Sequence, residues 1–166
     1  AVPRVGDLRR DRGDAVKVHS VHVRELPASV DVVGALVDEP ARMWPRRWPP
    51  LREDRIGFLR HEQLDHVPGL RRRYRIIGPR GFSGWHGWDV ETADHGTRLR
   101  HEVQAECRGW VRLGWLLVIR PIHDALHEDV LDEAARVVGG PPAARPWPPR
   151  VRFIRWAIRK GGLARA

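Results

Sequence analysis

The chain of 166 residues has little of what staples or anchors a small protein. Cys107 is its single cysteine, which excludes an internal disulfide and favours a reducing compartment. No apolar run approaches the roughly 20 residues that a transmembrane helix needs. The first 14 residues are too charged to resemble a signal peptide. A chain of this length buries a sufficient core without a disulfide or a metal, so we expect one folded cytoplasmic domain.

Motifs of nucleotide and hydrolase chemistry are missing as well. The sequence has no Gly-x-Gly-x-x-Gly dinucleotide loop, no Gly-x-x-x-x-Gly-Lys-Ser/Thr phosphate loop and no Gly-x-Ser-x-Gly nucleophile elbow. Lysine is nearly absent, at Lys17 and Lys160 only, so arginine carries the positive charge. We expect no cofactor, because a redox or nucleotide-driven reaction needs parts that this chain lacks.

Positive charge gathers at the C-terminal end. Residues 141–166 contain seven basic side chains and no acidic one, which is +7 of the net charge of +9. The Pro-rich residues 141–149 predict a semi-rigid spacer, and residues 150–160 predict a short basic amphipathic helix. Three interpretations of this extension stay open. It packs against the domain, it lies on an anionic membrane or over a pocket mouth, or it binds nucleic acid.

The first part of the sequence predicts an arm, a strand and then helices. Residues 1–15 have no apolar period and are expected to form a flexible arm. Val16–Leu26 has the pattern of a strand. Ser29 suits the N-cap of a helix that Pro40 ends, and residues 41–44 predict one further helical turn.

Two strands, residues 56–67 and 70–77, are expected to pair through the turn Val67-Pro68-Gly69-Leu70. Proline at the second position and glycine at the third specify a type II turn. The turn sets the register of the pair. The expected partners are His61 and Ile76, Gln63 and Tyr74, and Asp65 and Arg72.

A second hairpin, residues 84–92 and 97–108, leads into a helix predicted over residues 111–138. Its second strand alternates apolar and polar residues, which indicates a sheet that is wet on one face only. Setting Val90 opposite Leu99 turns His86, Trp88 and His101 inward. Pro121 should kink the helix. The helix carries an apolar stripe that fits the dry face of the sheet: Trp115, Ile119, Ile122, Leu126, Val130, Ala134 and Val137.

These elements predict an α+β domain of antiparallel strands with helices after the first strand and at the end. Their order resembles the START-like (SRPBCC) helix-grip superfamily, in particular its bacterial polyketide cyclase/dehydrase-like branch. The resemblance covers residues 16–140 and leaves 141–166 as an extension. It rests on Pro27-Ala28-Ser29, Asp38, Trp44, His61 before the Val-Pro-Gly turn, Gly81-Phe82-Ser83-Gly84-Trp85-His86, Gly96-Thr97-Arg98-Leu99, Trp115 and Arg120-Pro121-Ile122-His123-Asp124.

The resemblance implies a seven-stranded antiparallel sheet curved around a long C-terminal helix, with two short helices after the first strand. It also implies a pocket between sheet and helix for a small hydrophobic or aromatic ligand. The superfamily has no universal catalytic motif, so the resemblance specifies the fold more sharply than the function. Whether the protein is a monomer or a homodimer stays open.

Strand parity and register nominate the residues of this pocket. We expect ligand contacts from His61, Gln63, Arg72, Tyr74, Trp88, Val103, Trp115 and Ile119. His86 and His101 are the candidate catalytic residues, as general base and acid on a bound carbonyl compound, since histidine transfers protons near neutral pH. Tyr74 and Arg72 would orient the ligand oxygens. Each residue also has a structural interpretation: a buried histidine beside a tryptophan commonly serves packing, and Arg72 can pair with Asp65. Trp88, Trp110 and Trp115 are expected in the core.

Nine histidines raise the question of a metal site. His123 and His127 are spaced i, i+4 on the terminal helix, but the local sequence is not His-Glu-x-x-His. His61, His86 and His101 lie on three different strands, so the outer two are expected about 10 Å apart. We therefore expect no metal.

Two functions of different class follow from this interpretation. The first is a carrier or binding protein for a hydrophobic or aromatic molecule. The second is a cofactor-independent polyketide cyclase/dehydratase, and a helper associated with RNA or with a toxin–antitoxin-like system is a weaker third. An apolar cavity favours carriage, whereas contact of His86 or His101 with an open cavity beside Tyr74 favours chemistry.

Overall fold

The computed structural model describes residues 15–143 and 145–160. The expected arm therefore lies outside the described residues except for Ala15, and so do residues 161–166 of the extension. No helix of the described part is long and apolar enough to span a membrane.

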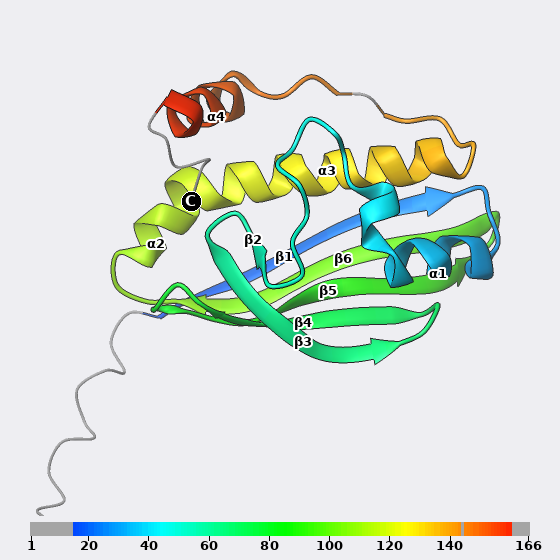
Figure 1. Ribbon diagram of the computed structural model, residues 1–166, viewed down its shortest axis with the longest axis horizontal. Coiled ribbons are helices and arrows are strands. Elements are labelled where there is room, and N and C mark those ends of the chain that lie inside the picture. The colour runs from blue at the N-terminus through cyan, green and yellow to red at the C-terminus, as the bar shows by residue number, and fades with distance from the viewer. Residues whose placement is uncertain (1–14, 144, 161–166) are drawn as a thin grey trace, which may run out of the picture.

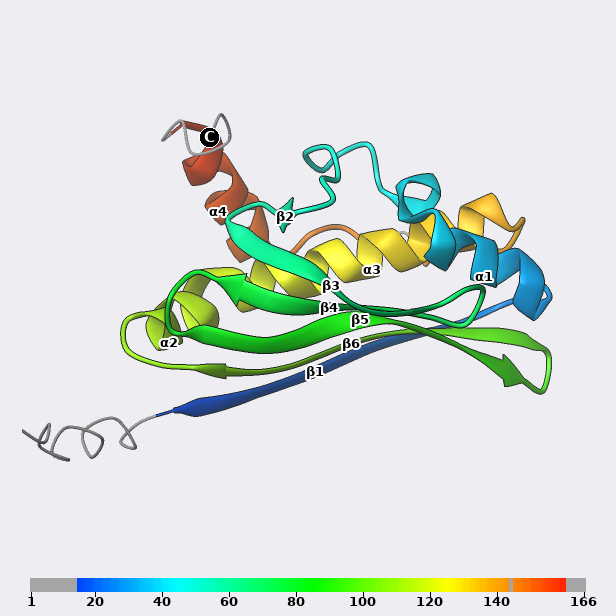
Figure 2. The same ribbon diagram turned by 60° about the horizontal axis from the view of Figure 1, so that its bottom comes forward.

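One antiparallel sheet forms the body of the protein (Figures 1 and 2). Its spatial order is β1-β6-β5-β4-β3-β2, so the first strand pairs with the last. The strands are β1 Val16–Leu26, β2 Arg55–Ile56, β3 Leu59–Val67, β4 Arg71–Gly78, β5 Phe82–Ala93 and β6 Gly96–Cys107. The described residues thus hold six strands, where the resemblance implied seven. The strand predicted over 56–67 is divided at Gly57, whose φ of 60° turns the chain between β2 and β3.

Helices cover one face of this sheet (Figure 1). The short ones after the first strand are α1 Val30–Asp38 and the 3-10 helix η1 Pro40–Met43, as predicted. The long helix comprises α2 Val111–Gly114, the π-helical turn η2 Trp115–Ile119 and α3 Arg120–Val137. Pro121 lies at the start of α3, where its missing N–H interrupts regular α-helical bonding directly after the π-helical turn. A last helix, α4 Pro149–Lys160, follows the Pro-rich spacer.

The register predicted for the second hairpin is confirmed. Val90 lies opposite Leu99, and Trp88 lies opposite His101. His86 pairs with Val103 on the same inner face. The strand parity read from the sequence is therefore the parity of the folded sheet.

The register predicted for the first hairpin holds only in part. The pairings of His61 and Gln63 are confirmed, but Asp65 lies opposite Arg73 and not opposite Arg72. The ladder shifts between Gln63 and Asp65, as a β-bulge at Leu64 requires. Asp65 accordingly pairs with Arg71, at 3.6 Å, and not with Arg72 as expected.

Apolar side chains fill both ends of the space between the sheet and the long helix. The end near α1, here called the α1 end, contains Leu26, Val33, Leu36, Val37, Leu99, Val130, Leu131 and Ala134, among others. The end near α2, the α2 end, contains Val18, Ile76, Phe82, Val103, Ala105, Cys107, Val111 and Trp115. Trp110 was expected in the core but is 71% exposed, because it lies in the turn before α2.

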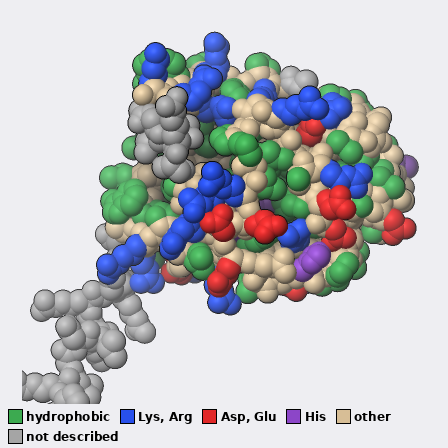
Figure 3. All heavy atoms as spheres, in the orientation of Figure 1, with side chains coloured by type: hydrophobic (Ala, Val, Ile, Leu, Met, Phe, Trp, Pro, Cys, Tyr) green, Lys and Arg blue, Asp and Glu red, His purple; other side chains and the backbone are tan. Residues whose placement is uncertain are grey.

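The C-terminal segment packs against the domain in the described residues. Val151 of α4 is buried, and the guanidinium of Arg155 lies 4.0 Å from the ring centroid of Trp48 and 4.2 Å from that of Trp147. Phe153 and Trp156 of α4 stay exposed. Figure 3 shows Lys and Arg side chains gathered over this helix. Contact of this surface with a membrane or with nucleic acid remains a prediction.

Candidate functional site

Six imidazoles gather between the two apolar ends, in a region we call the histidine centre. They come from four strands and from α3: His22, His61, His86, His101, His123 and His127. Their neighbouring ring centroids are between 3.6 and 5.8 Å apart. Strand parity places the strand histidines inward, and the i, i+4 spacing places the helix pair on the face of α3 that meets them.

One part of the centre is a triangle of nearly parallel rings from β3, β4 and β5, here called the ring triangle. The centroids of Tyr74 and His61 are 4.6 Å apart, those of His61 and His86 are 5.0 Å apart, and those of Tyr74 and His86 are 5.4 Å apart. Nδ1 of His61 and Nε2 of His86 are 2.8 Å apart and form a hydrogen bond, in which one of the two nitrogens carries the proton. Tyr74 is half-buried whereas His61 and His86 are buried, so Tyr74 is the most exposed member of the ring triangle.

His101 lies at the middle of the centre and is completely buried. Its ring stacks on His127 with centroids 3.6 Å apart, and Trp88 lies 4.7 Å away. Neither ring nitrogen of His101 has a hydrogen-bond partner among the described residues. Most buried polar groups in proteins are partnered, so this orphaned imidazole marks a place where something else is expected to bind.

Burial keeps the deep imidazoles neutral. It lowers the pKa of His86 to about 3, with a smaller contribution from His61. Burial likewise lowers the pKa of His101 and of His127 well below the ordinary value, and lowers that of His123. Neutral imidazoles are weak bases that still offer one lone pair each, which suits them to hydrogen bonding or to a metal ion.

Acidic side chains of α3 border the outer edge of the centre. His22 contacts Glu128 at 3.1 Å through Nδ1 and Asp124 at 3.3 Å through Nε2. Burial lowers the pKa of His22, but hydrogen bonds to these carboxylates outweigh it, so the pKa is raised. Hydrogen bonds from His123 and His22 outweigh burial at Asp124 and lower its pKa, so its carboxylate is ionised.

The structure brings together only some of the predicted ligand contacts. Trp88, Val103 and Trp115 are buried, and Ile119 is half-buried beside Trp115. Gln63 is exposed.

Arg72 lies beside Tyr74, the most exposed member of the ring triangle. It donates a 2.6 Å hydrogen bond to the carbonyl of Asp38, and its guanidinium lies 5.6 Å from the Tyr74 ring.

Sequence reasoning missed three members of the centre: His22, His123 and His127. The i, i+4 spacing of the helix pair was visible, but no pattern in the sequence indicated that His101 on β6 would meet it. That meeting depends on how α3 crosses the sheet.

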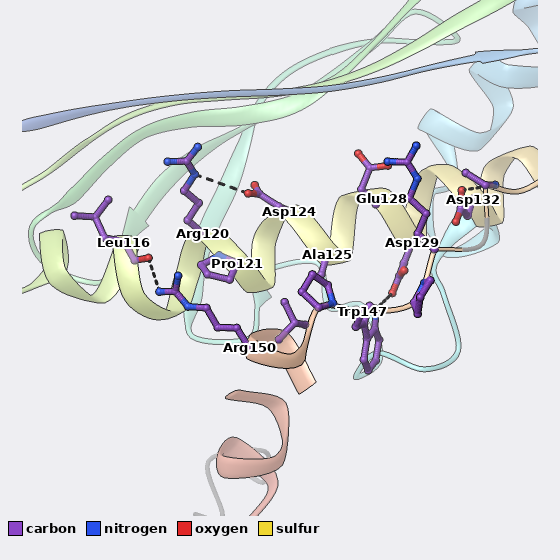
Figure 4. Close-up of a pocket in the computed structure, with 15 residues that line it drawn as sticks. Leu116, Arg120, Pro121, Asp124, Ala125, Glu128, Asp129, Asp132, Trp147 and Arg150 are labelled. Atoms are coloured by element: carbon purple, nitrogen blue, oxygen red, sulfur yellow. Dashed lines mark hydrogen bonds and ion pairs between the residues drawn. The ribbon is translucent and has the colours of Figure 1, made fainter. Parts of the chain in front are cut away.

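An open groove of about 520 Å³ lies elsewhere, between α3 and the C-terminal segment (Figure 4). Pro121, Ala125 and Trp147 contribute apolar surface to it. Asp129 joins α3 to the C-terminal segment and to the loop after η1, because its carboxylate accepts hydrogen bonds from the indole Nε1 of Trp147 at 2.9 Å and of Trp48 at 2.6 Å. The sequence did not predict this groove.

Comparison with solved structures identifies the fold. The di-domain ARO/CYC protein StfQ from the steffimycin biosynthetic pathway matches with a TM-score of 0.53 and 17% identity, over 74% of this chain and 51% of that one. BexL, a di-domain ARO/CYC from the BE-7585A biosynthetic pathway, matches with a TM-score of 0.53 and 18% identity, over 78% and 51%. A protein from Rhizobium leguminosarum matches with a TM-score of 0.51 and 17% identity, over 76% and 97%.

This likeness shows that the chain has the fold of these proteins, which is the helix-grip fold that the sequence resemblance implied. The chain spans about half the length of the two ARO/CYC proteins. No family model and no curated protein matches the sequence.

Proposed function

We propose that the protein binds a small hydrophobic or aromatic molecule between the sheet and α3, with entry beside Tyr74. The observation that carries the proposal is the ring triangle, in which half-buried Tyr74 lies beside buried His61 and His86. Nearly parallel ring faces match a planar ligand, which can stack on Tyr74 or take the place of contacts within the triangle. The fold shared with the ARO/CYC proteins supports a ligand of this kind.

Polar atoms beside the ring triangle would orient oxygen atoms of such a ligand. Nε2 of His61 and Nε of Arg72 have no hydrogen-bond partner among the described residues. Burial raises the pKa of Tyr74, so its hydroxyl stays protonated and can donate. A phenol or ketone beside these groups would gain hydrogen bonds that the two nitrogens lack within the described part of the chain.

Acid–base chemistry is the second candidate, and the His61–His86 hydrogen bond favours it. Two neutral imidazoles that share one proton, with a tyrosine hydroxyl beside them, can take up and return a proton at an enolisable carbonyl. The expected pair of His86 and His101 has ring centroids 5.8 Å apart. His101 is fully buried, so its direct action on a ligand would require the interior to open.

Native mass spectrometry of the full chain, followed by solvent extraction, tests the binding proposal first. We expect one small molecule per chain, or, for an empty protein, saturable binding of 2-naphthol seen as quenching of tryptophan fluorescence. Absence of both would contradict the proposal. Conversion of a poly-β-ketone analogue to a cyclised aromatic product would establish the second candidate.

Three variants locate the ligand. Tyr74→Ala removes the most exposed ring of the triangle and should weaken binding about tenfold or more, whereas Tyr74→Phe keeps the ring and should retain most of the affinity. Trp147→Ala alters the outer groove and serves as the matched aromatic control. Loss of binding in Trp147→Ala with full binding in Tyr74→Ala would place the ligand in the groove and refute the proposed site.

A further inference from the structure

Two histidines of α3 have their protons assigned by their partners. Nδ1 of His127 lies 2.8 Å from the carbonyl oxygen of His123, and a carbonyl can only accept, so this nitrogen carries the proton. Nδ1 of His123 lies 3.3 Å from the ionised carboxylate of Asp124, which also only accepts. In a neutral imidazole the other nitrogen is then bare. Nε2 of each residue therefore holds a free lone pair.

His101 faces this helix pair from β6. Its ring centroid is 3.6 Å from that of His127 and 5.4 Å from that of His123. One ligand nitrogen from each of the three residues lies within 4.8 Å of the others. Nε2 of His123 and both ring nitrogens of His101 have no partner in the described part of the chain.

Lone pairs gathered in this way suit a cation. The Nε2 atoms of His123 and His127 cannot hydrogen-bond to each other, because neither has a proton to donate, and the single N–H of a neutral His101 can donate to only one of them. Trp88 and Trp115 pack around the three rings, with ring centroids between 4.7 and 5.8 Å away. A metal ion would accept a lone pair from each of the three imidazoles at once.

We propose that His101, His123 and His127 form a binding site for a divalent transition-metal ion, with zinc the best match. Three neutral imidazoles are a known ligand set for zinc, and they leave one of the four tetrahedral positions open. Nitrogens bound at about 2.0–2.1 Å lie about 3.4 Å apart, so the three nitrogens must draw together and the stacked rings of His101 and His127 must turn away from each other when the ion enters. The sequence predicted no metal because the strand histidines and the helix pair His123 and His127 were considered separately, whereas the proposed site combines one strand histidine with the helix pair.

The surroundings of the three rings match those of metal-bound histidines. Such histidines donate their second ring N–H to a carboxylate or a backbone carbonyl, which fixes the tautomer. Asp124 supplies the carboxylate for His123, and the carbonyl of His123 serves His127.

An entry route for a cation runs along the acidic edge of the centre. Glu128 and Asp124 are 49% and 41% exposed in their side chains, and both line the groove between α3 and the C-terminal segment. Figure 4 shows both carboxylates on α3. His22 bridges them to His123, with ring centroids 5.5 Å apart, and could accept the ion in passing.

Metal titration of the full chain tests the site. The protein is stripped with a chelator and titrated with ZnCl₂ in competition with a chromogenic chelator, and a parallel titration uses CoCl₂. We expect one Zn²⁺ per chain with a Kd in the micromolar range or tighter. Cobalt should give the intense visible absorption of a tetrahedral nitrogen site. Binding of no zinc, or the weak pink spectrum of octahedral cobalt, would overturn the proposal.

Variants show whether the bound ion is at these residues. His101→Gln and His127→Gln should each weaken zinc binding about 100-fold, and Asp124→Asn should weaken it about tenfold through loss of the partner of His123. His95→Ala, in the exposed β5–β6 turn, is the matched control and should bind zinc as the unaltered chain does. If both glutamine variants bind zinc as tightly as the unaltered chain does, the ion is bound elsewhere on the surface, and the proposal is overturned.

Folding of the variants is checked by circular dichroism before titration. If a glutamine variant does not fold, Asp124→Asn and the cobalt spectrum of the unaltered chain decide the matter. A tetrahedral spectrum that disappears in Asp124→Asn or shifts towards that of an octahedral site supports the site. An unchanged spectrum and affinity in Asp124→Asn would contradict it.

Discussion

Along α3 the interior changes from apolar at its two ends to imidazole-rich in the middle. At the α1 end Leu99 and Leu131 are fully buried among aliphatic side chains. In the histidine centre His101 is equally buried but has two polar nitrogens without a hydrogen bond among the described residues. Burying a leucine stabilises the fold by about 1.5–3 kcal/mol, whereas burying an unpaired polar group costs about 1–3 kcal/mol.

This contrast indicates a division of labour. The apolar ends hold the sheet and helix together, and the centre lowers stability in return for chemistry that a leucine cannot provide. Four changes test the contrast, from the largest expected effect to the smallest.

Acid should unfold the protein through its histidine centre. The pKa of His86 is about 3 in the folded protein because of burial, against 6.5 in the unfolded chain. The pKa values of His101, His123 and His127 are lowered for the same reason. Below pH 6.5 the unfolded chain binds protons that the folded state excludes, so the free energy of unfolding falls by about 1.4 kcal/mol per pH unit for each histidine.

Four histidines acting together would remove a typical domain stability of about 5–15 kcal/mol within two or three pH units. Urea unfolding followed by circular dichroism at a series of pH values measures the loss. His22 has a raised pKa and acts in the opposite direction, with stability that is complete below pH 6.5 and lost as the pH rises through its folded value. A stability that does not change between about pH 7 and pH 5 would show that the centre is open to water.

Leu99→Ala should destabilise the α1 end strongly. The side chain is completely buried, so its truncation leaves a cavity and costs about 2–5 kcal/mol in the free energy of unfolding. Urea denaturation at neutral pH measures this cost. Val137→Ala on the exposed side of α3 is the control and should change stability by less than about 0.5 kcal/mol.

His101→Leu should have the opposite sign in the metal-free protein. Leucine has a similar volume and no polar atom, so the substitution removes the cost of two unpartnered nitrogens and should raise the free energy of unfolding by about 1–2 kcal/mol. In the same variant the free energy of unfolding should fall less steeply below pH 6.5, because one fewer histidine takes up a proton on unfolding. With excess zinc the unaltered chain should be more stable than the His101→Leu variant, because only the unaltered chain gains stability from the ion. A large loss of stability without metal would show that His101 makes a structural hydrogen bond after all.

Arg155→Ala should loosen the C-terminal segment with little effect on the sheet. Its guanidinium lies between Trp48 and Trp147 and donates to the carbonyl of Arg47, so we expect a loss of about 1–2 kcal/mol. Faster proteolysis within residues 141–149 would report the release. Arg152→Ala is the matched control, since this arginine is exposed. Equal proteolysis of both variants would show that the segment is held by other contacts.

Most of the sheet was predictable because alternation and turn chemistry are local. The second hairpin followed from the parity of residues 97–108, and the Val-Pro-Gly turn placed His61 and Gln63 correctly. The bulge at Leu64 was not predictable, because a one-residue insertion in a ladder leaves no compositional signal there. The prediction for Trp110 was wrong because its hydrophobicity indicates a core residue, whereas its position in the turn before α2 leaves the side chain exposed.

The candidate site was predictable only strand by strand. His61, His86, His101 and Tyr74 were assigned inward from parity, and the structure brings their rings together. The participation of α3 could not be foreseen, because helix periodicity tells which residues share a face but not which strand that face meets. The groove beside Trp147 was hidden for the same reason, since it depends on the path of the chain after residue 140.

By itself the sequence determined the α+β class, the strand pairs joined by short turns and the apolar stripe of the last helix. These depend on side-chain period, proline and glycine, which act within a few residues. Only the tertiary structure decided that β1 closes beside β6, and that His101 meets His123 and His127. It also explained Gly34, where a Cβ would lie 2.3 Å from the carbonyl oxygen of Gly69. Such contacts join residues far apart in the chain, and the packing of whole elements selects them.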